Sequence, residues 1–72
     1  MSIFGERLKQ LRTNKNLMQK SVAVDLELSP RAYQSYELGE REANYENIVK
    51  LADYFDVSTD YLLGRSDNPE RH

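Results

Sequence analysis

The sequence contains no cysteine and a single histidine, which is the last residue, His72. Without cysteine there is no disulfide framework and no thiolate zinc site, so a disulfide-stapled secreted scaffold is excluded and a reducing compartment is permitted. A lone histidine at the end of a polar stretch cannot form a histidine–carboxylate cluster with metal-binding or catalytic spacing. We therefore expect no metal, no cofactor and no enzymatic activity.

Long apolar segments are also missing. No stretch approaches the roughly 20 apolar residues that a membrane-spanning helix needs, and the start of the chain, MSIFGERLKQ, lacks the apolar region of a signal peptide. The few glycines do not form a phosphate-binding loop. We expect a cytoplasmic protein with no membrane partner.

Acidic residues slightly outnumber basic ones, and the formal net charge over the 72 residues is -2. Residues 1–41 carry seven Lys or Arg against five Asp or Glu, a balance of +2, whereas residues 42–72 carry three against seven, a balance of -4. Because phosphate contacts depend on Lys and Arg, the acidic total counts against nonspecific nucleic-acid binding. The uneven distribution fits a domain that contacts DNA with one side only.

Apolar residues recur at three- and four-residue spacing along the chain, which predicts helices, and no alternating stretch is long enough to be a strand. The expected helices cover residues 3–14, 19–26, 30–38, 45–55 and a short segment closed by Gly64. Their predicted N-terminal caps are Ser2, Ser29, Asn44 and Ser58. The sequence thus predicts one all-α domain over residues 1–64, followed by a flexible polar tail over residues 65–72.

The run from Gln19 to Gly39, QKSVAVDLELSPRAYQSYELG, joins two of these helices through a few residues. Its second helix opens with Ser29, which can cap the first turn, and Pro30, whose ring suits the first helical position. This arrangement is that of a helix-turn-helix, which presents its second helix to the major groove of DNA. An ordinary helix pair that binds nothing is the alternative interpretation of the run.

Further residues repeat a known pattern over roughly residues 3–64. They are Leu8, Arg12, Leu17, Gln19, Ala23, Leu26, Ser29, Tyr36, Glu37 and Gly39, with the segment LADYFDVSTDYLLG. In these features the sequence resembles the Xre/Cro family of helix-turn-helix regulators, which are common in phages, mobile elements and bacterial chromosomes. The resemblance implies a compact five-helix, lambda-repressor-like fold. It also implies a Cro-like or repressor-like transcriptional regulator that binds DNA sequence-specifically, with a place in a phage lysis–lysogeny switch.

The resemblance implies specific DNA contacts. Gln19 is implied as a phosphate contact, and Arg41 and Asn44 as contacts to the DNA backbone. The outward face of the third helix, implied to meet base edges, comprises Pro30, Arg31, Gln34 and Ser35. An arginine can bind guanine and a glutamine can bind adenine, so Arg31 and Gln34 are the expected base contacts. The alternative is that these two residues are ordinary solvated side chains on an exposed helix.

The resemblance also implies an ion pair between Arg12 and Glu37 that braces the first helix against the third. Its role is structural, because it holds the DNA-facing helix at its angle. Three tyrosines, Tyr33, Tyr36 and Tyr45, are interpreted as core residues with their hydroxyls at the surface.

Some residues depart from the family pattern. Met18 stands where Thr or Ser usually caps the second helix, a loss of about 1 kcal/mol. Glu27 stands where Gly is usual in the tight turn, which adds strain of about 1 kcal/mol if the backbone there is left-handed. Val24 and Leu38 are apolar where polar residues are usual. Together with Met18 they are either scattered surface residues or a protein-docking patch.

Two functions follow from these observations. The first is a transcriptional regulator that binds double-stranded operator DNA as a homodimer on a palindromic site, joined through the fifth helix, the loop before it or the tail. The second is an antirepressor or repressor modulator, which would bind a cognate helix-turn-helix repressor by protein–protein contact. It would use acidic groups and the apolar residues of the docking patch against that partner's basic surface.

Overall fold

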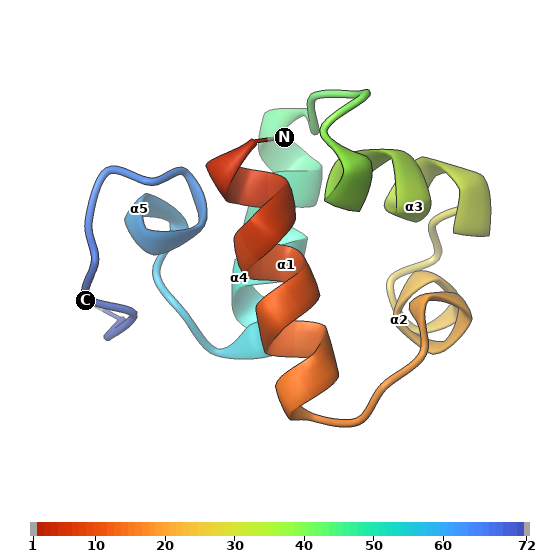
Figure 1. Cartoon of the computed structure of the whole chain (residues 1–72), viewed down its shortest axis with the longest axis horizontal. Helices are drawn as coiled ribbons and strands as arrows, with labels where there is room; N and C mark the ends of the chain where they lie inside the picture. Colours follow the sequence, from red (N-terminus) through yellow and green to blue (C-terminus); the bar gives the residue numbers. More distant parts are fainter. Residues whose placement is uncertain (1, 72) are drawn as a thin grey trace.

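The computed structural model describes residues 2–71, and within this range the chain forms five α-helices and no strand. The helices are α1 (Ile3–Asn14), α2 (Gln19–Asp25), α3 (Pro30–Leu38), α4 (Tyr45–Phe55) and α5 (Thr59–Leu62). In Figure 1, α1 lies in front of α4, with α2 and α3 on one side of this pair and α5 on the other. The predicted all-α, five-helix fold is confirmed.

Side-chain caps start every helix of the described chain except α2. In each case the capping oxygen accepts the backbone N–H three residues later, at 2.8–3.1 Å, and the caps are Ser2, Ser29, Asn44 and Ser58. At the start of α2, Met18 has the extended conformation of a cap but makes no capping hydrogen bond. All four predicted caps are therefore confirmed. The predicted lack of a side-chain cap at Met18 is confirmed as well.

Within residues 2–71, three residues other than glycine adopt the left-handed backbone conformation: Asn16, Glu27 and Asp56, with φ of 56–57°. Asn16 lies in the turn after α1. Glu27 lies in the turn between α2 and α3, where the sequence analysis expected strain if the backbone is left-handed, and the backbone there is left-handed. Asn and Asp tolerate this conformation better than Glu, so the strain is concentrated at Glu27.

The hydrophobic core draws on all five helices and on the turn after α4. Its buried members are Leu8, Val22, Ala23, Tyr33, Tyr36, Leu51, Ala52, Phe55, Val57 and Leu62. At its edge, Phe4 packs against the ring of Tyr36 with the ring centroids 6.2 Å apart in an edge-to-face arrangement.

The tyrosine interpretation is correct in part. Tyr33 and Tyr36 are core residues, but Tyr45 is 82% exposed, because the first turn of α4, residues 45 and 46, extends beyond the core. The hydroxyl of Tyr36 accepts a hydrogen bond from Asn47 Nδ2 at 3.0 Å. The hydroxyl of Tyr33 is not at the surface: it is buried and makes no hydrogen bond within residues 2–71.

Helices α1 and α3 approach each other closely at Gly5. A Cβ atom at this position would lie 2.6 Å from the carbonyl oxygen of Tyr36 and 2.5 Å from that of Glu37. Both neighbours are backbone atoms, which cannot rotate away. Glycine is therefore required here for the spacing of the two helices.

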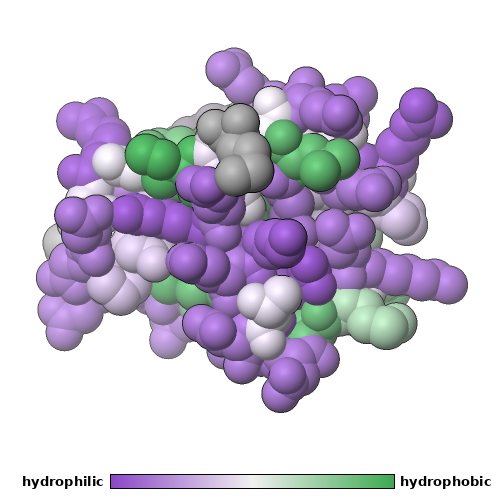
Figure 2. Space-filling model, viewed as in Figure 1, coloured by the Kyte–Doolittle hydropathy of each residue, from purple (hydrophilic) through white to green (hydrophobic). Residues whose placement is uncertain are grey.

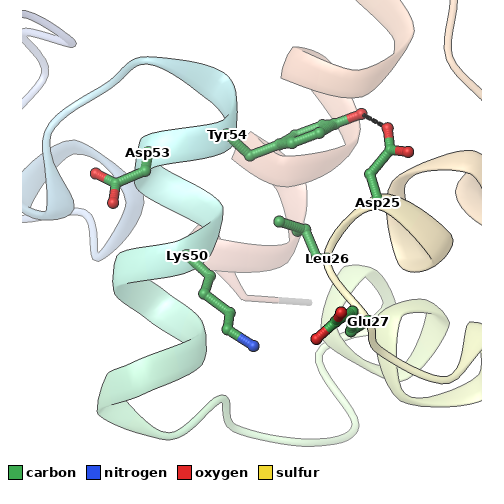
Figure 3. Close-up of a pocket in the computed structure, with 6 residues that line it drawn as sticks. All are labelled: Asp25, Leu26, Glu27, Lys50, Asp53 and Tyr54. Carbon is green, nitrogen blue, oxygen red and sulfur yellow. Dashed lines mark hydrogen bonds between the residues drawn. The ribbon is translucent and has the colours of Figure 1, made fainter.

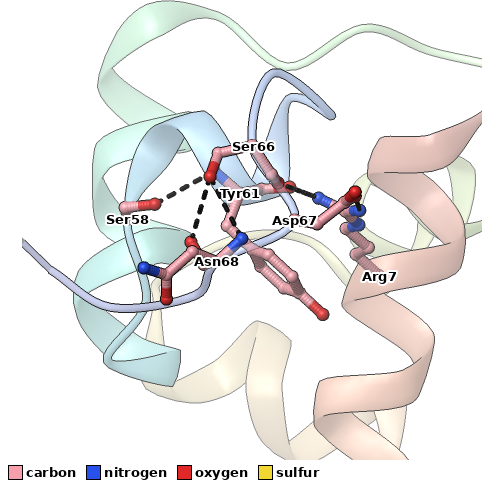
Figure 4. A network of polar contacts seen from close by, with 6 residues as sticks. All are labelled: Arg7, Ser58, Tyr61, Ser66, Asp67 and Asn68. Carbon is pink, nitrogen blue, oxygen red and sulfur yellow. Dashed lines mark hydrogen bonds and ion pairs between the residues drawn. The ribbon is translucent and has the colours of Figure 1, made fainter.

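Residues 65–71 fold back onto the domain. Arg7, from α1, donates from Nη1 to the carbonyl oxygens of Tyr61 and Ser66, and from Nη2 to Asp67 Oδ1 at 2.8 Å (Figure 4). Its guanidinium also lies 4.1 Å from the ring centroid of Tyr61, a cation–π distance.

Two further contacts close the segment. The N–H of Ser58 donates to the carbonyl oxygen of Pro69 at 3.0 Å, and Arg71 donates to the carbonyl oxygen of Ala52 and to Asp53 at the end of α4. The flexibility predicted for residues 65–72 stays a prediction, and His72 lies outside the described residues.

Figure 2 shows a largely hydrophilic face on which hydrophobic side chains form small separate groups. None of the helices in residues 2–71 has the length and apolar character needed to cross a membrane. Over the same residues, no group of three or more His, Asp or Glu side chains is placed to hold a metal ion.

Candidate nucleic-acid interface

An open groove of about 610 Å³ lies between the start of α2 and the outer face of α3. We call it the α3 groove. It is lined by Gln19, Lys20, Pro30, Arg31, Gln34, Ser35, Leu38 and Glu40. Five of the seven residues that the sequence predicted to contact DNA thus come together in one hollow, although they come from two helices.

The outer face of α3 is accessible. Pro30, Arg31 and Gln34 are exposed, and Ser35 is half-buried, with its hydroxyl donating to the carbonyl oxygen of Arg31 at 2.9 Å. Neither Arg31 nor Gln34 makes a side-chain hydrogen bond or ion pair to another residue in the range 2–71. Their donors and acceptors are available to a ligand.

Lys20 is a groove residue that the sequence interpretation missed. It is exposed and follows Gln19 in the first turn of α2. The signal was present in the sequence as a basic residue directly after the implied phosphate contact. With Arg31 it places two cations along the α3 groove, opposed by one carboxylate, Glu40, at the far end of α3.

Arg12 and Glu37 form the expected ion pair between α1 and α3. Arg12 Nε lies 2.6 Å from Glu37 Oε2, and Arg12 Nη2 lies 3.1 Å from Glu37 Oε1. The remaining guanidinium nitrogen, Nη1, donates to the carbonyl oxygen of Leu17 at 2.9 Å. One side chain therefore fixes α1 to α3 and also to the segment that leads into α2.

The Glu37 carboxylate is almost completely enclosed, with its side chain only 2% exposed. Burial alone would raise the pKa of Glu37, but the hydrogen bonds from Arg12 and Gln19 and the positive charge of Arg12 lower it below the ordinary value of 4.5. Glu37 is thus ionised at neutral pH. Burial raises the pKa of Tyr33, which lies in the same region, so its hydroxyl stays protonated.

Gln19 is tied to this ion pair. Its Nε2 donates to Glu37 Oε1 at 2.9 Å, so the implied phosphate contact is half-buried and held by a hydrogen bond. The sequence interpretation assigned Gln19 and Glu37 separate roles. Their hydrogen bond could not be foreseen, because it depends on the angle between α2 and α3.

Arg41 and Asn44 lie outside the α3 groove, in the loop that follows α3. Arg41 is exposed and lines a separate hollow with Phe4, Ile48 and Leu63. The side chain of Asn44 is engaged in capping α4. Their predicted backbone contacts would therefore use a second part of the surface.

The three residues of the predicted docking patch are all exposed, but the structure does not gather them in the α3 groove. Leu38 lines the groove, whereas Met18 and Val24, from the start and the end of α2, do not.

A different hollow lies where the end of α2 meets α4 (Figure 3). The hydroxyl of Tyr54 donates to Asp25 Oδ2 at 2.6 Å, and this hydrogen bond raises the pKa of Tyr54 to about 12. The rest of the lining is the apolar Leu26 with Glu27, Lys50 and Asp53, so its charged side chains are mainly acidic. This face attaches α2 to α4 and has the charge that phosphate disfavours.

The same segments match a family model described as helix-turn-helix, over residues 8–62. The chain belongs to this helix-turn-helix family. The match runs from the first turns of α1 to the end of α5, so it includes both walls of the α3 groove and the ion pair behind it.

Three helix-turn-helix relatives illustrate the range of similarity. The uncharacterized HTH-type transcriptional regulator YqaE of Bacillus subtilis (strain 168) is 41% identical over 66 residues, which are 92% of this chain and 57% of YqaE. The SPbeta prophage-derived uncharacterized HTH-type transcriptional regulator YonR of the same organism is 41% identical, over 85% of this chain and 56% of YonR. The cryptic phage CTXphi transcriptional repressor RstR of Vibrio cholerae serotype O1 is 40% identical, over 83% of this chain and 54% of RstR. The chain thus spans little more than half the length of these relatives.

Proposed function

We propose that this helix-turn-helix protein is a transcriptional regulator that binds double-stranded operator DNA sequence-specifically and carries out no catalytic step. The observation that carries the proposal is the α3 groove, in which an exposed helix face with unengaged Arg31 and Gln34 lies beside Gln19 and Lys20. The names of the relatives support it, since one is a phage transcriptional repressor and another is a prophage-derived regulator. A place in a phage switch and a cytoplasmic location belong to the same proposal.

In the proposed complex, α3 enters the major groove. Arg31 pairs with guanine O6 and N7, and Gln34 pairs with adenine N6 and N7, because these side chains fit those base edges. Gln19, Lys20 and Arg41 hold the phosphates on either side and set the position of α3 without carrying sequence information. Pro30, Ser35 and Asn44 complete the contact surface.

We also propose that the regulator is a homodimer, joined through the hollow beside the loop after α3. Its apolar part consists of half-buried Phe4, Ala43 and Ile48 and exposed Leu63. Two neighbouring residues of opposite charge, Arg41 and Glu42, stand on its rim. A two-fold axis brings the same apolar patch together on both copies, while Arg41 on the rim stays available for the DNA backbone. A second copy is therefore the occupant that this surface fits.

The DNA-binding proposal is tested by selecting duplexes from a randomised pool and measuring affinities at two salt concentrations. Replacing Arg31 with Ala should relax the preference at one base position by about 1–3 kcal/mol. Replacing Lys20 with Ala should weaken all duplexes alike and reduce the salt slope by about 1. The matched control is Lys50→Ala, a lysine of the hollow between α2 and α4, which should change neither property. A pool from which no duplex is enriched at low salt would reject the proposal.

The homodimer is tested by sedimentation of the wild type and of Leu63→Glu. The substitution places a charge in the apolar hollow and should shift the protein to monomer while leaving the helical circular-dichroism spectrum intact. Equal molecular masses for the two proteins would show that the copies join elsewhere or not at all.

The antirepressor alternative has less support, because only Leu38 of its three docking residues lies at the α3 groove. It would be favoured by a protein that selects no duplex yet prevents a helix-turn-helix repressor from binding its operator.

A further inference from the structure

We infer that Glu37, which is buried and does not line the α3 groove, is a positioning residue that holds the side-chain amide of Gln19 ready for a phosphate. This inference rests on the proposed DNA binding and adds a residue to it. Its basis is one oxygen atom, Glu37 Oε1, which accepts hydrogen bonds from both Arg12 Nη2 at 3.1 Å and Gln19 Nε2 at 2.9 Å.

The chemistry of the two groups determines how the amide is turned. An ionised carboxylate only accepts hydrogen bonds, so Gln19 must present its nitrogen and not its oxygen to Glu37. A phosphate also only accepts. Because the amide nitrogen carries two N–H groups, one can remain on Glu37 while the other donates to the DNA backbone.

The surroundings of the hydrogen bond make it persistent. The Glu37 side chain is 2% exposed and its other oxygen, Oε2, is held by Arg12 Nε at 2.6 Å, so the acceptor cannot rotate away. Gln19 itself is half-buried and lines the α3 groove. A glutamine without this anchor would lose rotamer freedom on binding DNA, and that loss weakens affinity.

The test is a double-mutant cycle in duplex affinity, measured on the best selected duplex. In the otherwise wild-type protein, Gln19→Ala should weaken binding about 3- to 10-fold, the effect of one modest hydrogen bond. In a Glu37→Gln background, which keeps the shape but removes the fixed charge, the same Gln19→Ala change should weaken binding less than about 2-fold.

A second background guards against loss of the fold. The paired change Arg12→Met with Glu37→Met replaces the ion pair by apolar side chains of similar length, an exchange that other buried pairs tolerate. Gln19→Ala should again have little effect there. The matched control is Gln34→Ala, because Gln34 lies in the same groove without a hydrogen bond to Glu37, and its effect should be equal in all backgrounds.

A readout without DNA comes from the side-chain amide signals of Gln19 in ¹H–¹⁵N spectra. In the wild type the two amide protons should be widely separated in chemical shift, and both replacement backgrounds should bring them together. Chemical shifts of the Gln19 amide protons that do not change when Glu37 is replaced would overturn the inference.

The possible failures are distinct. If Gln19→Ala weakens binding equally in every background, Glu37 has no positioning role, although Arg31→Ala still relaxes base preference and the proposed function stands. If no duplex binds the wild type, the proposed function fails and the positioning role fails with it.

Discussion

The half of the molecule that carries the α3 groove is held together differently from the half formed by α4, α5 and residues 65–71. In the first half, α1 and α3 meet at Gly5 and share the enclosed Arg12–Glu37 pair. In the second half the corresponding ion pair, Arg71 with Asp53, is open to solvent, with side chains 42% and 59% exposed. Buried charge is costly to leave unpaired, whereas exposed charge is readily solvated. The groove half should therefore be the more sensitive to the loss of one member of its ion pair.

The two halves also differ in helix capping, backbone strain and unpaired polar groups. The groove half contains the uncapped start of α2, the left-handed Glu27 and the unpaired hydroxyl of Tyr33. The other half has a cap at the start of both of its helices, and its left-handed residue is Asp56, a better choice than Glu. The comparison indicates that local stability has been given up near the groove, where the sequence also departs from the family pattern.

Removing one member of each ion pair should give the largest difference in stability between the two halves. Arg12→Ala leaves the Glu37 carboxylate buried without its partner and should lower the free energy of unfolding by about 3 kcal/mol. That is a large share of the about 4–10 kcal/mol expected for a domain of this size. Arg71→Ala should leave the urea unfolding midpoint almost unchanged. Similar losses in the two variants would contradict the comparison.

Adding a methyl group at two glycines gives the next largest difference. Gly5→Ala should destabilise the fold by about 2 kcal/mol, because the new Cβ meets backbone carbonyls of α3. Gly64→Ala meets only the side chain of Ile3, which can move, and should lose about 1 kcal/mol through its left-handed φ of 79°. Thermal unfolding measures both, and Gln10→Ala on the exposed side of α1 is the control. A milder effect at Gly5 than at Gly64 would show that α1 and α3 are not in close contact.

Relieving the strained turns should stabilise the protein, and more so in the groove half. Glu27→Gly should raise the free energy of unfolding by about 1 kcal/mol, since glycine adopts the left-handed conformation without a Cβ penalty. Asp56→Gly should raise it less, because aspartate already tolerates this conformation. Urea titration of the two variants shows which gains more stability. A larger gain for Asp56→Gly would contradict the assignment of the strain to the groove half.

Acid should act selectively through Glu37. The folded state lowers the pKa of Glu37 below 4.5, so its ionisation contributes stability that is complete above the unfolded pKa and is lost as the pH falls through the folded pKa. When the pH is lowered from 7 to below the folded pKa of Glu37, the free energy of unfolding should fall less in Glu37→Gln than in the wild type. The same exchange at exposed Glu70 is the matched control. Parallel acid losses in wild type and Glu37→Gln would argue against the depressed pKa.

Much of the fold could be predicted because its signals are local. The capping residues, the tight turn at Glu27 and the helical apolar spacing each act over a few residues, and the structure confirms them. Tyr45 shows the limit: its spacing places it on the apolar face of α4, but only the packing of other helices decides where the core ends. The contacts of residues 65–71 with Arg7 and with the end of α4 were missed for the same reason, since they join positions far apart in the chain.

The residues of the candidate site could be predicted better than the contacts between them. Resemblance supplied Gln19, Arg31 and Gln34 as members, and the structure brings them into one groove. Lys20 could have been added from its position after Gln19. The hydrogen bond from Gln19 to Glu37 and the separation of Arg41 from the groove depend on the angle between helices, which no local pattern contains.

The docking of residues 65–71 against the end of α4 has a practical consequence for labelling. Figure 1 shows residues 65–71 on the side of α5, across the molecule from α2 and α3. Fluorophores, affinity handles or fused reporter proteins attached there would stand clear of the α3 groove. Immobilising the protein through residues 65–71 should therefore preserve access for large ligands, whereas attachment through Lys20 would obstruct them.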